Sequence, residues 1–193
     1  AENPKIRCIS YQPNQGKGGA LREGTAHAEG DYIAFCDADL DLAPEQLADF
    51  IDRMQRENAD VVIGSKMHPE SKVDYPAIRR VYSWGYYILL LLLFRLNVRD
   101  TQTGLKLFKA EVIKPVMRQI LVKRFAFDIE VLAIINARGY KIISAPIEVV
   151  FHRVSFGRIG FRDIRNMFID TLAIFYRLHI LHYYDKAATL ERS

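Results

Sequence analysis

Cysteine is scarce in this chain, with only two residues, Cys8 and Cys36, among 193. Two thiols cannot build a disulfide framework, and without a CxxC pair they exclude the common cysteine-based zinc sites. Because both cysteines lie in apolar runs, we predict that they are small buried hydrophobic residues in a reducing compartment.

Long apolar runs and basic stripes are also missing. The longest apolar run, Tyr86 to Phe94, is about half of the ~18–20 residues that cross a bilayer, so we expect no spanning helix. Lys and Arg do not alternate with aromatics as in single-strand nucleic-acid binders. The formal charge of +4 is still compatible with phosphates or acidic lipid headgroups as partners.

Strand-like and helix-like segments alternate along the chain, which predicts one α/β domain with a parallel sheet and helices on both of its faces. Ligands bind such sheets beyond the carboxyl ends of the strands. The predicted strands are 5–11, 32–36, 60–64, 105–108 and 141–151. The predicted helices are 20–28, 44–57, 76–96, 127–138 and 161–184.

Three aspartates, Asp37, Asp39 and Asp41, follow the strand at 32–36. Carboxylates this close repel each other unless a cation lies between them. Mg²⁺ or Mn²⁺ prefers such oxygen ligands and bridges diphosphate oxygens. The alternative is that these residues cap the helix that begins near Pro44.

Three further polar segments each allow a functional and a structural interpretation. The glycine-rich loop 14–19 precedes a helix and is either a phosphate cradle or a tight turn that requires glycine. The turn 100–104 is either part of a site or an ordinary Asx or Ser/Thr turn. Asp128 and Glu130 begin a helix, where acidic residues are expected in any case.

The order and spacing of these segments resemble one known family. The segments are NxGKGGA, DADLD, GSK, RDTQTGLKLF and FAFDIEVL. They resemble the family-2 glycosyltransferases with the GT-A fold over residues 9 to 151. Within that family the chain looks most like the dolichyl-phosphate β-glucosyltransferases of the polyprenyl-phosphate branch, and less like the dolichol-phosphate mannose synthases.

This resemblance implies a GT-A-like, mostly parallel sheet with helices on both faces. It implies inverting, metal-dependent transfer of a hexose from a nucleotide sugar to a polyprenyl phosphate. The implied metal ligands for Mg²⁺ or Mn²⁺ are Asp37, Asp39 and Asp41. The implied catalytic residues are Asp39, Asp100, Gln102, Asp128 and Glu130. The implied substrate-binding residues are Lys17, Gly18, Lys66, Arg79, Ser83, Arg153 and Arg158.

The chain also departs from the family pattern. Relatives place a PxYNE-like strand and a strand ending in DDGS before the segments found here, and these hold the base and ribose. Without them we expect an unpaired sheet edge and poor nucleotide binding by this chain alone. Either the chain is a fragment, or those strands come from elsewhere, with a completing chain or a homo-oligomer as the partner. A basic GxSK-type loop of the family is replaced by residues 152–158.

Two helices combine apolar and aromatic residues with flanking arginines. They are 81–96, within the helix predicted at 76–96, and 161–184. This composition is typical of helices that lie in the headgroup plane, although core packing or a dimer interface remains an alternative. We therefore expect a partial catalytic domain at 1–151, a membrane-proximal segment at 152–193, and a location on the cytoplasmic face of a membrane.

Two other functions remain open. A non-catalytic remnant of the same fold would bind lipid phosphate or a partner chain, and a nucleotidyltransferase would also use acidic metal ligands on a related sheet. The absent nucleotide-binding strands favour the remnant, whereas the intact DADLD and DTQTG segments favour the enzyme.

Overall fold

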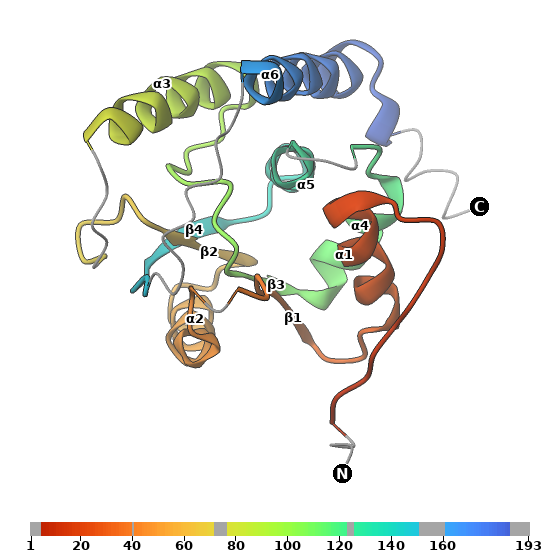
Figure 1. Ribbon diagram of the computed structural model, residues 1–193, viewed down its shortest axis with the longest axis vertical. Coiled ribbons are helices and arrows are strands. Elements are labelled where there is room, and N and C mark those ends of the chain that lie inside the picture. The colour runs from red at the N-terminus through yellow and green to blue at the C-terminus, as the bar shows by residue number, and fades with distance from the viewer. Residues whose placement is uncertain (1–4, 40, 72–76, 123–125, 151–160, 186–193) are drawn as a thin grey trace.

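A four-stranded mixed sheet forms the centre of the protein (Figure 1). The computed structural model describes residues 5–39, 41–71, 77–122, 126–150 and 161–185, without the side chains of 77–83 and 161–164. The strands are β1 (Tyr32–Phe35), β2 (Val61–Ser65), β3 (Lys106–Lys109) and β4 (Ile142–Pro146). Their order is β1-β3-β2-β4.

Strand β3 runs against its neighbours. It pairs antiparallel with both β1 and β2, whereas β2 and β4 are parallel. Strands β1, β2 and β4 therefore point in one direction, and the expected α/β class with a mostly parallel sheet is confirmed. Because β3 is reversed, the turn that precedes it lies at the carboxyl ends of β1 and β2.

Helices cover both faces of the sheet (Figure 1). They are α1 (Gly16–His27), η1 (Pro44–Gln46), α2 (Leu47–Arg56), α3 (Ala77–Phe94), α4 (Ala110–Gln119), α5 (Phe127–Ala137), α6 (Phe161–Phe175) and the π-helical turn η2 (Tyr176–Ile180). On one face, Phe50 and Met54 of α2 pack with Val62 and Leu107. This explains the single apolar side of α2, as expected for a helix exposed to water on its other side.

Helix α5 is the central helix of the other face. Its residues from Phe127 to Ile135 are all buried, which agrees with a helix that is apolar around most of its circumference. It packs against α3, α4 and α6, so that α3 and α6 form an outer layer (Figure 1). The hydroxyl of the half-buried Tyr86 on α3 lies 3.0 Å from that of the buried Thr171 on α6.

Two sequence predictions are wrong, and one helix was not predicted. Residues 5–11 form no strand in the described part of the chain, because no described strand lies beside them to pair with. Cys8 and Cys36 are exposed rather than buried; Cys36 lies just past the last residue of β1. Helix α4 was not predicted, because Pro115 in its interior breaks the pattern by which helices are recognised.

The outer helices bear on the predicted domain division. No helix among the described residues is long and apolar enough to cross a bilayer. The predicted boundary at 151/152 lies at the edge of residues outside the description. Ile174, Leu178 and Tyr184 nevertheless belong to the same hydrophobic cluster as β1 and α5, so the described C-terminal helices share the core of the sheet.

Candidate functional site

The acidic residues after β1 lie at the carboxyl end of that strand, as predicted. Ile33 and Phe35 anchor β1 in the core, and the chain then leaves the sheet into Asp37 and Asp39. The Asp37 carboxylate accepts a hydrogen bond from Lys17 Nζ at 2.8 Å. Asp39 Oδ1 lies 3.3 Å from the backbone N–H of Asp41. The helix-capping alternative is not supported, since η1 has no side-chain cap.

The polar turn before β3 meets both strand ends. Gly104 lies so close to Asp37 that a Cβ at this position would overlap the carboxylate. In the same turn, Asp100 Oδ2 accepts the backbone N–H of Lys66, just after β2, at 3.0 Å. The turn thus joins the ends of β1 and β2, and Gly104 is required for its close approach to Asp37. The role of Gly104 was not predicted, although its place in the DTQTG segment was a usable signal.

Lys17 of α1 also lies at the carboxyl end of β1, beside Asp37. Burial by itself would lower the pKa of this ammonium, but the hydrogen bond to Asp37 and the charges of Asp128, Asp37 and Asp39 hold the pKa above its ordinary value. Lys17 therefore stays cationic at neutral pH. A cation held among carboxylates at the start of a helix is suited to binding phosphate oxygens.

Asp128 and Glu130 at the start of α5 are much less accessible. Asp128 pairs with the buried Lys106 of β3, with 2.6 Å between Oδ1 and Nζ. Glu130 is fully buried. Its oxygens accept the N–H groups of Leu121 and Val122 and the side chains of Arg177 and Tyr184. Lys106, Arg177 and Tyr184 were not predicted as partners of these acids.

The acids after β1 fit a metal site with two carboxylate ligands better than a site in which the protein supplies every ligand. Among the described residues, no three histidines, cysteines or acids converge to hold a metal ion, so Asp41 does not complete a cluster with Asp37 and Asp39. Magnesium commonly uses one or two carboxylates together with substrate phosphates. Asp37 and Asp39 offer such a pair of hard oxygen ligands.

The remaining predicted residues are only partly placed. Gln102 is exposed and its Nε2 lies 3.1 Å from Met167 Sδ on α6. Gly18 is buried near the start of α1. The side chains of Arg79 and Ser83, and all of Arg153 and Arg158, lie outside the description.

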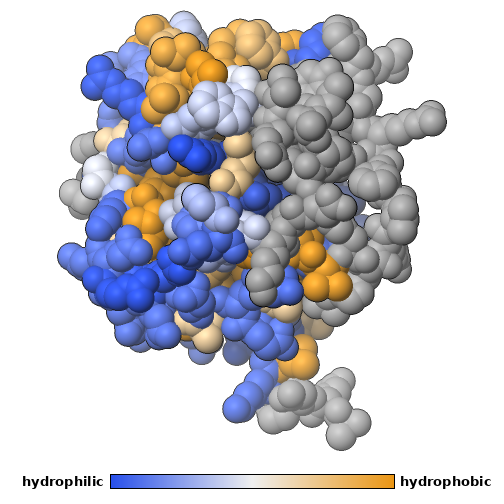
Figure 2. Space-filling model, turned by 90° about the vertical axis from the view of Figure 1, so that its left-hand side faces the viewer, coloured by the Kyte–Doolittle hydropathy of each residue, from blue (hydrophilic) through white to orange (hydrophobic). Residues whose placement is uncertain are grey.

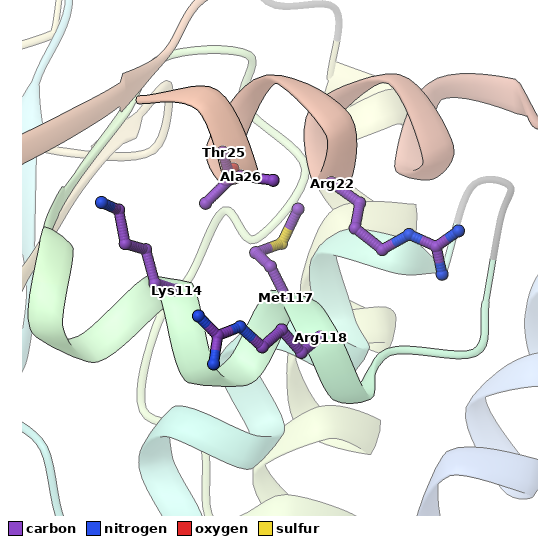
Figure 3. A pocket seen from close by; sticks show the side chains of 6 residues that line it. All are labelled: Arg22, Thr25, Ala26, Lys114, Met117 and Arg118. Carbon is purple, nitrogen blue, oxygen red and sulfur yellow. The ribbon is translucent and has the colours of Figure 1, made fainter. Parts of the chain in front are cut away.

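A separate cavity lies between α1 and α4 (Figure 3). Its volume is about 340 Å³. Arg22, Lys114 and Arg118 surround it, and the buried Thr25 and Met117 contribute to its lining. None of the acidic residues of the candidate site lines this cavity.

The outer helices expose apolar side chains at helical spacing. On α3 these are Trp84, Ile88 and Leu92, of which Leu92 is 76 % exposed. In Figure 2, apolar side chains gather along the upper edge of the molecule, where α3 lies in Figure 1. The C-terminal helices expose Phe168, Leu172, Tyr176 and Ile180, which are spaced by four residues. Solvent-exposed stripes of this kind indicate an interaction surface rather than core packing.

Known proteins resemble this chain in sequence and in fold. The family model described as glycosyl transferase family 2 matches residues 1–117. A dolichyl-phosphate beta-glucosyltransferase of Trichomonas vaginalis is 32 % identical over 91 % of this chain and 55 % of its own length. The Homo sapiens dolichyl-phosphate beta-glucosyltransferase is 34 % identical over 75 % of this chain and 46 % of its own length. The chain thus spans about half the length of these curated relatives.

Solved structures agree on the fold. The glucosyl-3-phosphoglycerate synthase of Mycobacterium tuberculosis, solved with Mn²⁺, UDP-glucose and phosphoglyceric acid, gives a TM-score of 0.60 at 19 % identity. The match covers 87 % of this chain and 55 % of that one. At this identity the likeness establishes the GT-A-like fold alone.

Proposed function

Because the chain belongs to glycosyl transferase family 2, we propose that it transfers a hexose from a nucleotide sugar to a polyprenyl phosphate at a membrane surface. The observation that carries the proposal is the meeting of Lys17, Asp37 and Gly104 where β1 ends. Glucose from a UDP donor is the first substrate to test, since the relatives named above are dolichyl-phosphate beta-glucosyltransferases.

Asp37 and Asp39 would hold Mg²⁺ or Mn²⁺, which neutralises charge on a diphosphate leaving group when bound. The structural neighbour that carries Mn²⁺ and UDP-glucose supports a divalent ion in this fold. Asp41 would act on this site only indirectly, through its backbone N–H on Asp39 or through water.

Cationic side chains around the acids would bind the phosphates. Lys17 lies among the carboxylates, and Lys66 follows β2 beside Asp100. We assign the same function to Arg79, Ser83, Arg153 and Arg158. Charge-assisted hydrogen bonds of this kind orient the donor and the acceptor without doing covalent chemistry.

The acceptor needs orientation more than activation. A phosphate monoester has a second pKa near 6 and is largely dianionic at neutral pH. Its oxygen attacks the sugar C1 on the face opposite the diphosphate, so one C–O bond forms as the other breaks and the centre inverts. Asp100 and Gln102 orient the sugar hydroxyls, and Asp128 acts on the site through Lys106 and the charge it presents to Lys17.

The exposed apolar stripes on α3 and on the C-terminal helices would lie against the bilayer interface. Their residues are Trp84, Ile88 and Leu92, and Phe168, Leu172, Tyr176 and Ile180. Aromatic and aliphatic side chains in such stripes suit the boundary between headgroups and acyl chains. We propose that the enzyme works on the membrane face that meets nucleotide sugars, where the acceptor phosphate would also lie.

The test compares two Asp→Asn variants of the full-length protein. Asp39→Asn should lower transfer from UDP-glucose to dolichyl phosphate, measured with Mn²⁺ and radiolabelled donor, on the order of 10²–10³-fold. Asp52→Asn, on the exposed side of α2, is the matched control and should keep full activity. Equal activity in both variants would remove the metal assignment. Binding of donor and lipid without any transfer by the unmodified protein would favour a non-catalytic binding role.

A further inference from the structure

A buried network joins the C-terminal segment to the core through Glu130. Glu130 Oε1 accepts a hydrogen bond from Tyr184 and lies 3.1 Å from a guanidinium nitrogen of Arg177. Arg177 Nε also donates to the Tyr184 hydroxyl at 2.9 Å. Tyr184 and Glu130 have almost no access to water, with 1 % and 0 % exposure, whereas the Arg177 side chain is 19 % exposed. A buried carboxylate costs free energy unless it has hydrogen-bond partners, so Glu130 depends on Tyr184 and Arg177.

The other oxygen of Glu130 holds the backbone that follows α4. Oε2 accepts the N–H of Leu121 at 3.0 Å and that of Val122 at 2.7 Å. One carboxylate therefore fixes two consecutive peptide groups on one side and two side chains of the C-terminal segment on the other. All four of its bonds are charge-assisted, and such bonds are stronger than those between neutral groups.

The same backbone supports the first turn of α1. A Cβ built on Gly18 would lie 3.0 Å from the carbonyl oxygen of Val122 and 2.9 Å from the ring of Phe127. Gly18 therefore rests directly on Val122 and Phe127. The next residue toward the N-terminus is Lys17, whose ammonium binds Asp37. A displacement of Val122 would move the turn that carries Lys17.

Arg177 reaches the network from an irregular part of its helix. It lies in η2, where α6 widens into a π-helical turn. Such a turn inserts a residue and re-aims the side chains that follow it. On the outer side of the same turn, Tyr176 and Ile180 are exposed. One short segment thus has an apolar outer face and an arginine that binds the buried Glu130.

We infer that Glu130 is a positioning residue that links the C-terminal segment to the start of α1, so that Arg177 and Tyr184 hold Lys17 in place beside Asp37. The consequence for catalysis rests on the proposed function; the mechanical link does not. Contact of Tyr176 and Ile180, on the outer face of η2, with a lipid surface would then stabilise the position of Lys17 beside Asp37. Asp128, two residues before Glu130, belongs to the ion pair with Lys106 instead.

The test uses two tyrosine variants that each lose a hydroxyl group joining a C-terminal helix to the rest of the protein. Tyr184→Phe removes the bonds to Glu130 and Arg177, whereas the control Tyr86→Phe removes the contact with Thr171 on α6. Hydrogen exchange is followed at the amides of Ala20, Leu21 and Arg22. In an α-helix these amides bond to the carbonyls of residues 16, 17 and 18. We expect exchange about tenfold faster in Tyr184→Phe than in Tyr86→Phe, under conditions of equal global stability.

A second variant and a double-mutant cycle provide independent tests of the link. If Tyr184→Phe folds poorly, Arg177→Met replaces it. This variant retains the aliphatic stem and should also speed exchange in α1. The double variant Glu130→Gln/Tyr184→Phe should exchange no faster than Glu130→Gln alone, because both changes break one pathway. Equal exchange in Tyr184→Phe and Tyr86→Phe, or strict additivity in the double variant, overturns the link.

Kinetics of the full-length protein separate this inference from the proposed function. Tyr184→Phe should raise KM for the sugar nucleotide several-fold with a smaller change in kcat, because Lys17 binds the donor. An accelerated exchange in α1 together with no transfer by the unmodified protein supports the link and removes the proposed function. Transfer with an unaltered KM in Tyr184→Phe overturns the positioning function of Glu130.

Discussion

Two acidic pairs with the same spacing lie in opposite environments. Asp37 and Asp39 follow a strand and are reached by water, and Asp37 has one flexible lysine as partner. Asp128 and Glu130 begin a helix and are buried, each with a cation bound to it. The first pair retains coordination capacity for a ligand, whereas Glu130 uses both oxygens within the protein. Spacing alone therefore does not identify a metal site; the difference comes from the partners.

Glu130 should give the largest effect on stability. Glu130→Ala removes the acceptor shared by Arg177, Tyr184 and two backbone N–H groups, so we expect the free energy of unfolding to fall by about 3–5 kcal/mol. Urea denaturation followed by circular dichroism measures the change. Glu111→Ala, at the exposed start of α4, should cost less than about 1 kcal/mol. Similar losses in both variants would contradict the network.

Substitution of Asp37 should have a small effect on stability and a large effect on activity. Asp37→Asn removes only an exposed ion pair with Lys17, so the free energy of unfolding should change by less than about 1 kcal/mol. Transfer by the full-length protein should nevertheless fall about 100-fold, because a neutral amide is a weak ligand for a divalent ion. Thermal unfolding and a donor-transfer assay on the same sample test this separation, and a strongly destabilised but active variant would reverse the comparison.

Gly104 tests the contact between the turn and Asp37. Gly104→Ala places a methyl group against the Asp37 carboxylate, and such overpacking typically costs about 1–3 kcal/mol. Gly24→Ala is the control, because a Cβ added there in α1 meets nothing within 4 Å beyond its chain neighbours and the backbone of its own helix. That change should stabilise the helix by about 0.5–1 kcal/mol. Differential scanning calorimetry of the two variants should therefore show shifts of opposite sign.

Asp60 offers a smaller contrast at the other end of β2. It binds Lys109 Nζ at 2.8 Å and the N–H of Lys141 at 2.9 Å. Burial would raise its pKa, but these bonds and the nearby charges bring the pKa below the ordinary 3.8. The stabilisation is complete above the unfolded value and is lost as pH falls through the folded value. Between about pH 5 and about pH 3, the melting temperature of Asp60→Asn should therefore fall less than that of the unmodified protein.

The features that local patterns encode were predictable. The apolar side of α2 and the carboxylates after β1 were found, because both follow from residues adjacent in the chain. The position of Gly104 against Asp37, and of Arg177 and Tyr184 against Glu130, depends on contacts between distant segments. The predicted strand at 5–11 failed for the same reason, since a strand needs a partner that its own sequence does not specify.

The reversed strand has a consequence for the order in which the sheet assembles. β1 and β2 do not pair with each other, because β3 lies between them. During synthesis, neither β1 nor β2 can pair with β3 until residue 109 has been added. Contacts between segments so far apart in the chain form slowly. Until then, α2 can pack only loosely on β2, and the apolar side chains of both remain open to chaperones and to misassembly.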